Sequence, residues 1–171
     1  MNGQTSLVVV LLLMVLLAGG SLFLLSFAQA INQDEYINLF AHNFLLAGLR
    51  ANTGFTDPNC RTVTDTATCA FFNPGYACNN QVPCTEAVKT TLTGFAMEVG
   101  LARRNFRYLI VIEGDGFIAR SPDGTPFRVE VGDTSLKNKS GKRYVANERL
   151  QTVLSSGIAT LKATVIVAPK G

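Results

Sequence analysis

The sequence predicts an α+β fold, in which a long N-terminal transmembrane or amphipathic helix precedes a disulfide-containing loop, one further helix and an antiparallel sheet of four to five strands. Three observations support this prediction. A run of apolar residues lies near the N-terminus, four cysteines lie between residues 60 and 84, and apolar residues alternate with others after residue 105. A long apolar run is typical of a membrane helix, and alternation is typical of strands.

The length and composition of the chain restrict its organisation. It has 171 residues, of which 47% are hydrophobic and 16% charged. Without the apolar N-terminal part, about 140 residues remain, which is enough for one domain and excludes a large multidomain enzyme. We therefore predict three parts: a membrane anchor or signal segment at 1–30, an amphipathic continuation of its helix at 31–52, and an extracytoplasmic α+β domain at 53–171.

Residues 7–28 are expected to bind the membrane. No charged side chain occurs from residue 3 to residue 33, and a helix over 7–28 would reach about 33 Å, the hydrocarbon thickness of a bilayer. The run is longer than the apolar part of a secretory signal peptide, which favours a retained anchor at the cell surface. Cleavage after Ala30, at the end of an A-x-A site, would instead give a secreted protein.

The amphipathic part is predicted to continue the N-terminal helix. Its apolar positions recur at helical spacing and form one arc: Ile37, Phe40, Ala41, Phe44, Leu45 and Gly48. Leu39, Leu46 and Leu49 lie outside this arc, where a solvated face would carry polar residues. The helix is therefore either a core helix between two layers of its own domain, or one that also packs against neighbouring copies of the chain. In the second case, the packing residues are Leu39, Leu46, Leu49, Phe40 and Phe44.

The first residues of the chain resemble the start of a type IV pilin-like protein. Gly3-Gln4-Thr5-Ser6, an aliphatic run and a continuous amphipathic helix are most similar to the archaeal proteins with a class III signal peptide. This resemblance covers residues 1–50 and implies a cut between Gly3 and Gln4, after which the apolar run stays on the chain as anchor and filament core. Asn2 replaces the basic residue usual before the glycine, and Val8 replaces the glutamate of bacterial pilins.

The four cysteines predict disulfide bonds. Cys60, Cys69, Cys78 and Cys84 are an even number in a short polar stretch, which indicates an oxidising, extracytoplasmic compartment. Short loops favour Cys60 with Cys69 and Cys78 with Cys84, although three pairings exist and the sequence does not select one. Zinc is the rival interpretation, but the spacing lacks the closely spaced pairs of structural zinc sites, so we expect no metal and no cofactor. Residues 55–83 are predicted to be irregular.

A second helix and several strands are predicted beyond the cysteines. Thr85 and Glu86 are typical of a helix start, and the expected core face is Val88, Leu92, Phe95, Val99 and Ala102. Arg103 and Arg104 are placed in its last turn, and Met97 and Phe95 in the core. The predicted strands are 106–113, 117–120 and 127–131, arranged as a meander with a turn at 114–116, and then 143–154 and 158–167, joined as a hairpin.

The sequence contains no catalytic signature, so we expect no enzyme activity. His42 is the single histidine, and neither a G-x-S-x-G motif nor a phosphate-binding glycine loop occurs. Glu113, Asp115 and Asp123 follow successive turns, which allows a carboxylate hydrolase as a remote alternative, but turns recruit aspartate for their own backbone.

Two functions follow from these observations. The first is a membrane-anchored extracytoplasmic structural or assembly subunit, pilin-like or pseudopilin-like, with the membrane (through 7–28) and further copies of the chain as partners. The alternative is a secreted or surface-anchored binding module that contacts anionic surfaces through a basic loop of Lys137, Lys139, Lys142 and Arg143. No nucleic acid is expected, because aromatic side chains are nearly absent from this loop, and a small-molecule ligand stays unknown. Asn138 begins a glycosylation sequon, which is typical of an exposed loop.

Overall fold

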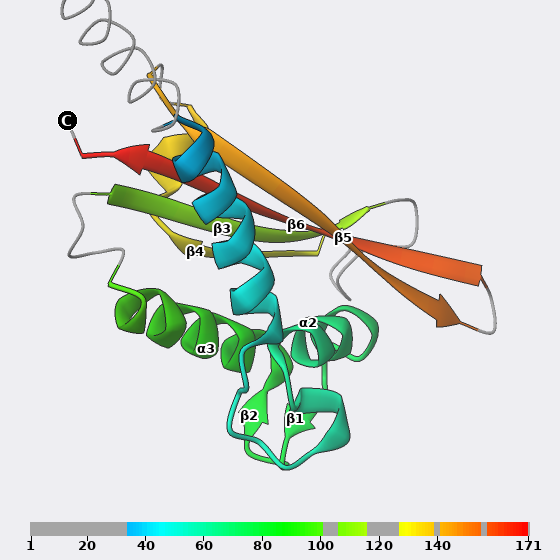
Figure 1. Cartoon of the computed structure of the whole chain (residues 1–171). Coiled ribbons are helices and arrows are strands. Elements are labelled where there is room, and N and C mark those ends of the chain that lie inside the picture. The colour runs from blue at the N-terminus through cyan, green and yellow to red at the C-terminus, as the bar shows by residue number, and fades with distance from the viewer. Residues whose placement is uncertain (1–33, 101–105, 116–126, 139–140, 155–156, 171) are drawn as a thin grey trace, which may run out of the picture. The chain divides into compact units, whose positions relative to one another are not determined.

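The computed structural model describes residues 34–100, 106–115, 127–138, 141–154 and 157–170 (Figure 1). These residues form three α-helices, a four-stranded antiparallel sheet and a two-stranded hairpin, so the predicted α+β class is confirmed. The chain forms two compact units, Met1–Ile37 and Asn38–Gly171. Within the described residues, every helix is too short or too polar to cross a bilayer. The apolar run at 7–28 lies outside them.

The first helix covers residues 34–50. Its buried positions within the second unit are Ala41, Phe44, Leu45, Gly48 and Leu49. This stripe contains most of the predicted arc, and it faces α3. The rings of Phe44 and Phe95 lie 5.2 Å apart, and a Cβ atom on Gly48 would meet the Phe95 ring at 3.2 Å. A glycine therefore allows the two helices to approach closely.

Helix α2 (Val63–Phe72) lies within the stretch that was predicted to be irregular, so that prediction is wrong here. Thr62 and Asp65 form a capping box: each side chain accepts a hydrogen bond from the backbone N–H of the other. The buried positions recur at helical spacing: Val63, Thr66, Ala67, Ala70 and Phe71. Small and polar residues occupy much of this face. The helical spacing is therefore not visible when only large apolar side chains are considered.

Short elements connect α2 to its neighbours. The 3-10 turn η1 (Pro58–Cys60) precedes α2, and a hairpin of β1 (Ala77–Cys78) and β2 (Val82–Pro83) follows it. Asn79 and Asn80 have φ of 50° and 57°, in the left-handed region that asparagine tolerates, and they turn the chain between the two strands.

Helix α3 (Cys84–Glu98) confirms the predicted second helix, with different ends. It begins one residue before Thr85, and its cap position, Pro83, provides no side-chain hydrogen bond. It ends at Glu98, so Arg103 and Arg104 are not in its last turn; both lie outside the described residues. Met97 was expected in the core, but its side chain is 64% exposed because it lies on the face away from Leu92 and Ala96.

The sheet has the strand order β4-β3-β6-β5, with β3 at Phe106–Asp115, β4 at Arg128–Gly132, β5 at Tyr144–Leu154 and β6 at Gly157–Pro169. Four of the predicted strands are thereby confirmed, and the fifth, at 117–120, falls outside the described residues. The meander is wrong, because β3 pairs directly with β4 on one side and with the C-terminal β6 on the other. Strand β3 also continues through Gly114 to Asp115, where a turn was expected.

Both faces of the sheet are covered near its centre. The helices lie on one face, where Phe44 contacts Tyr108 and Phe71 of α2 contacts Phe127, with ring centroids 6.4 and 5.3 Å apart. On the other face, Leu109, Val111 and Ala168 pack around Leu136 of η2 (Thr134–Lys137). Burial on both sides explains why residues 109–112 are all apolar.

Candidate functional site

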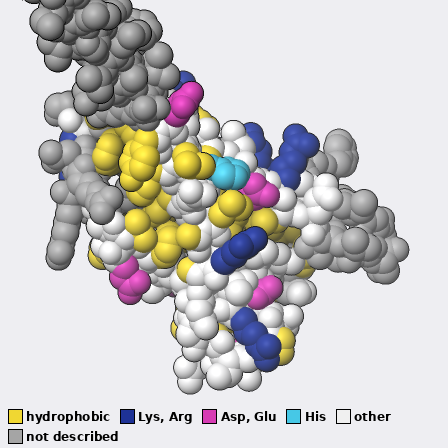
Figure 2. Space-filling view, in the orientation of Figure 1, with side chains coloured by type: hydrophobic (Ala, Val, Ile, Leu, Met, Phe, Trp, Pro, Cys, Tyr) yellow, Lys and Arg dark blue, Asp and Glu magenta, His cyan; other side chains and the backbone are white. Residues whose placement is uncertain are grey.

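The outer face of helix 34–50 carries the first candidate site. Leu39 is 59% exposed, and Leu46, seven residues later and therefore on the same stripe, is half-buried. His42 and Asn43 lie between them and are exposed. Figure 2 shows hydrophobic side chains gathered over this helix and toward α3. The helix thus presents apolar side chains on a surface that its own domain leaves open.

The other predicted packing residues lie closer to the domain. Phe44 is buried, and Phe40 is half-buried and stacks on Phe44 with the ring centroids 6.2 Å apart. Leu49 was expected outside the buried arc, but only 3% of it is exposed. Helix α2 lies close to this end of the helix, since the Thr64 hydroxyl donates a hydrogen bond of 2.9 Å to the carbonyl oxygen of Leu49. Leu39 and the exposed part of Leu46 therefore remain as candidates for contacts with another molecule.

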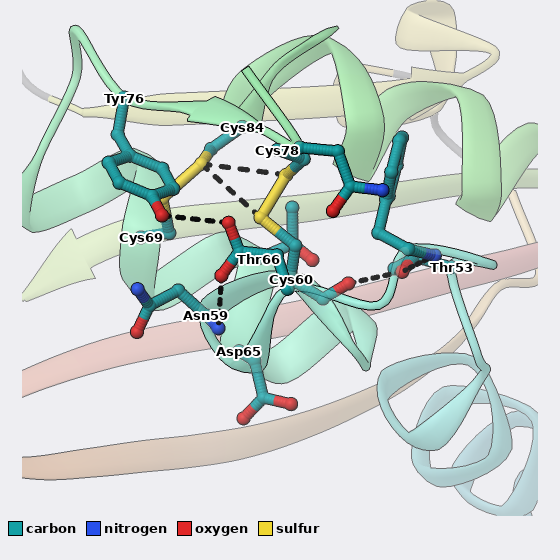
Figure 3. The surroundings of a disulfide bond; sticks show 12 residues. Thr53, Asn59, Cys60, Asp65, Thr66, Cys69, Tyr76, Cys78 and Cys84 are labelled. Atoms are coloured by element: carbon teal, nitrogen blue, oxygen red, sulfur yellow. Dashed lines mark hydrogen bonds between the residues drawn. A yellow bond between two sulfur atoms is a disulfide. The ribbon is translucent and has the colours of Figure 1, made fainter. Parts of the chain in front are cut away.

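The cysteine cluster is the second candidate site. The disulfides are Cys60–Cys78 and Cys69–Cys84, so the pairing favoured by short loops is wrong. Helix α2 carries Cys69 to the start of α3, where Cys84 is the first residue. All four cysteines are buried, and Figure 3 shows their sulfur atoms gathered in one cluster. The two crosslinks join η1 to β1 and α2 to α3.

A carboxylate lies beside this cluster. The Tyr76 hydroxyl donates a hydrogen bond of 2.7 Å to Asp57, and the backbone N–H of Asn59 donates another of 2.9 Å (Figure 3). These hydrogen bonds hold the pKa of Asp57 below its usual value, the one from Tyr76 having the larger effect. The ionised carboxylate therefore connects η1 to the chain just before β1.

Replacing Tyr76 by phenylalanine is expected to raise the pKa of Asp57 toward its usual value, because the hydroxyl donor is removed. A carboxyl group with a lowered folded-state pKa stabilises the fold above its unfolded pKa and loses this effect as the pH falls through its folded pKa. The variant should therefore lose less stability on acidification than the wild type does. Carboxyl ¹³C NMR titration of both proteins measures the shift, and an identical Asp57 titration would contradict the assignment.

The basic loop is partly occupied by contacts within the domain. Lys137 forms an ion pair with Glu130 and donates a hydrogen bond to it. This hydrogen bond, together with the charge of Arg128, lowers the pKa of Glu130. Arg143 donates hydrogen bonds of 3.3 and 3.2 Å to the carbonyl oxygens of Leu136 and Lys137. Lys142 lies 5.9 Å from the centre of the Tyr144 ring, and Lys139 lies outside the described residues. At least two of the four basic side chains therefore hold the loop in place.

The remaining candidates form no assembled centre among the residues that the structure covers. Glu113 lies 4.0 Å from Lys162, while Asp123 and the side chain of Asp115 are outside the described part. A partly enclosed pocket beside α2 is lined partly by Asn59, Asp65 and Phe72. Asp65 already caps its own helix there, so the pocket adds no group poised for chemistry.

Comparisons with protein-family models, curated proteins and solved structures find no match for this chain.

Proposed function

We propose that the chain is a membrane-anchored subunit with a structural role outside the cytoplasm, and that it assembles with copies of itself in the manner of type IV pilin-like proteins. In this proposal, residues 7–28 hold the protein in the membrane and helix 34–50 provides the contact surface. The crosslinked α+β domain then faces outward. The role requires no catalysis.

The exposure of Leu39 on a helix whose opposite face is buried is the observation that carries this proposal. A leucine side chain that leaves water at an interface contributes about 1.5–3 kcal/mol. Half-buried Leu46 extends the apolar stripe along the helix. A contact between this stripe and a different surface of the next copy would repeat along a filament, as heterologous interfaces do when their rotation does not close.

The two disulfides support a location outside the cytoplasm. Such bonds persist in oxidising compartments and are rare in the cytosol. The alternative role, a binding module that uses the basic loop, receives less support. The side chains of Lys137 and Arg143 already contact Glu130 and backbone carbonyl oxygens of their own domain.

Processing of the N-terminus tests the anchor. Intact-mass measurement of protein purified from its native membrane fraction should give a chain that begins at Gln4 and retains the apolar run. A mature chain that begins at Ile31 would contradict the proposal, because neither the anchor nor a membrane-spanning filament core would remain.

Replacing Leu39 by aspartate tests the assembly surface. The variant should lose self-association in membranes or detergent, because the new charge would have to be buried against the neighbouring subunit, while its thermal unfolding stays close to that of the wild type. Met97→Asp is the matched control, since it puts the same charge on an equally exposed apolar residue of α3, outside the proposed surface. Crosslinking and size measurements report the oligomer. The proposal fails if Leu39→Asp assembles normally or if Met97→Asp disrupts assembly equally.

A further inference from the structure

The two disulfides lie closer to each other than crosslinking alone requires. The Cys84 Sγ atom, bonded to Cys69, lies 3.8 Å from the Cys78 Sγ atom and 3.9 Å from the Cys60 Sγ atom. The sulfur atoms of Cys60, Cys69 and Cys84 all lie within 4.8 Å of one another. Four sulfur atoms from four different elements therefore share one small buried volume, with Cys84 at its centre (Figure 3).

Two of these spacings, both from Cys84, match those of a tetrahedral thiolate site. With zinc–sulfur bonds of about 2.3 Å, the sulfur atoms of a four-cysteine zinc site lie about 3.8 Å apart. The two distances from Cys84 to the other disulfide already have this value. The two bonded pairs would have to separate, and Cys78, which lies outside the group within 4.8 Å, would have to move closer to Cys69.

We propose that the reduced chain binds one Zn²⁺ ion through Cys60, Cys69, Cys78 and Cys84. The sequence spacing argued against this site because it lacks closely spaced cysteine pairs. Such pairs serve to place two ligands on one short turn, whereas here η1, α2, β1 and α3 each supply one ligand. The same four side chains would then hold a metal ion in the chain before its disulfides form, and crosslink the domain by disulfides in an oxidising compartment.

A dithiol reductant provides the electrons and protons for the conversion of the disulfides to thiols. Two dithiol molecules give four electrons and four protons to the two disulfides, and each forms its own internal disulfide, which leaves four thiols on the chain. Binding of Zn²⁺ replaces the four S–H bonds by four Zn–S bonds and releases four protons. The metal centre then carries two net negative charges.

The start of α3 favours that negative charge. Cys84 is the first residue of this 15-residue helix; its backbone N–H donates a hydrogen bond of 3.2 Å to the carbonyl oxygen of Tyr76, and Pro83 provides no side-chain cap. A helix N-terminus stabilises a thiolate over a thiol, and it also stabilises a nearby anionic centre. The central sulfur atom is therefore also the one best placed to ionise.

Thiol–disulfide exchange is the competing use of this cluster, and the geometry disfavours it. Exchange requires the attacking sulfur to approach along the extension of the S–S bond. Cys84 lies almost equally far from the two sulfur atoms of the Cys60–Cys78 bond, 3.9 and 3.8 Å, and is therefore beside this bond rather than at its end. That position suits a shared metal ligand better than a nucleophile.

Cobalt substitution tests the proposal directly. The full chain in detergent is reduced with a phosphine, which competes little for metal, and is titrated with Co²⁺ without oxygen. We expect one Co²⁺ per chain, with the visible bands and sulfur-to-metal charge transfer of tetrahedral thiolate coordination, and displacement by Zn²⁺. The oxidised chain should give none of these signals.

Two variants identify the ligands. Cys78→Ser should weaken Co²⁺ and Zn²⁺ binding by at least about 100-fold, because it removes a direct ligand. Loss of a residue that only hydrogen-bonds to a ligand typically weakens binding by about 10- to 100-fold, and loss of a ligand itself should cost more. Asp57→Asn is the control: it removes the neighbouring carboxylate and should leave the affinity unchanged. Circular dichroism of the reduced wild type should also show a Zn²⁺-dependent, chelator-reversible rise in thermal stability. Absence of the tetrahedral spectrum in the reduced wild type, or a spectrum that Cys78→Ser does not change, would overturn the proposal.

Discussion

Replacing Cys69 and Cys84 together by alanine is expected to lower the free energy of unfolding by about 3 kcal/mol under oxidising conditions. The two residues are separated by 15 positions, so their bond restricts the unfolded chain substantially. A domain of this size has a total stability of about 5–15 kcal/mol, which makes the loss a large fraction of it. Urea denaturation followed by circular dichroism measures the effect.

The same variant tests which cysteines are paired. The other disulfide, Cys60–Cys78, should stay closed, so alkylation under denaturing conditions should find no free thiol. The matched double variant Cys60→Ala/Cys78→Ala should lose a similar amount of stability, because its loop, with a separation of 18, is only slightly longer. Two free thiols in the Cys69→Ala/Cys84→Ala variant would contradict the Cys60–Cys78 pairing.

Replacing Gly132 by alanine is expected to destabilise the domain by about 3 kcal/mol. Gly132 ends β4 with φ of +110°, a conformation that side chains rarely adopt, and a Cβ atom there would lie 2.3 Å from the carbonyl oxygen of Tyr108. That oxygen is fixed, since it accepts a hydrogen bond of 2.8 Å from the N–H of Asp133. The backbone of β3 or β4 would therefore have to move.

Gly94→Ala provides the control for this experiment. Gly94 lies within α3, its φ is ordinary, and a Cβ atom would meet nothing within 4 Å. Alanine should therefore raise stability by up to about 1 kcal/mol, through the higher helix propensity of alanine. Chemical denaturation of both variants beside the wild type measures the two changes. Equal stabilities for Gly132→Ala and the wild type would contradict the strained close contact at β4.

Local periodicity explains what could be predicted from the sequence. The buried stripe of helix 34–50 includes the large apolar residues Phe44, Leu45 and Leu49, and the strands alternate with period two, so both elements were recognisable. Helix α2 was missed because Thr66, Ala67 and Ala70 are small or polar, although the capping box of Thr62 and Asp65 was a usable signal. The pairing of the cysteines could not be derived without this helix, since α2 determines which sulfur atoms meet.

Long-range arrangement explains what could not be predicted. Strand β6 pairs with β3 along ten residues, from Phe106 opposite Pro169 to Asp115 opposite Thr160, and no turn connects these strands directly. Turn residues favour contacts between neighbouring segments, which is why a meander was expected. The exposure of Leu39 could not be predicted either, because Leu39 and Leu49 both lie outside the expected arc and only Leu49 is buried by the rest of the domain.

The central place of β6 has a consequence for synthesis of the protein on the ribosome. Until residues 157–169 have left the exit tunnel, β3 lacks one of its two neighbours, and β5 lacks the partner with which it pairs in the sheet. A nascent chain that has emerged only as far as residue 154 therefore carries helices that can pack on one another and strands that cannot yet form the full sheet. Co-translational folding should accordingly proceed in two stages, the cysteine-rich helical part first and the sheet only after release of its last strand.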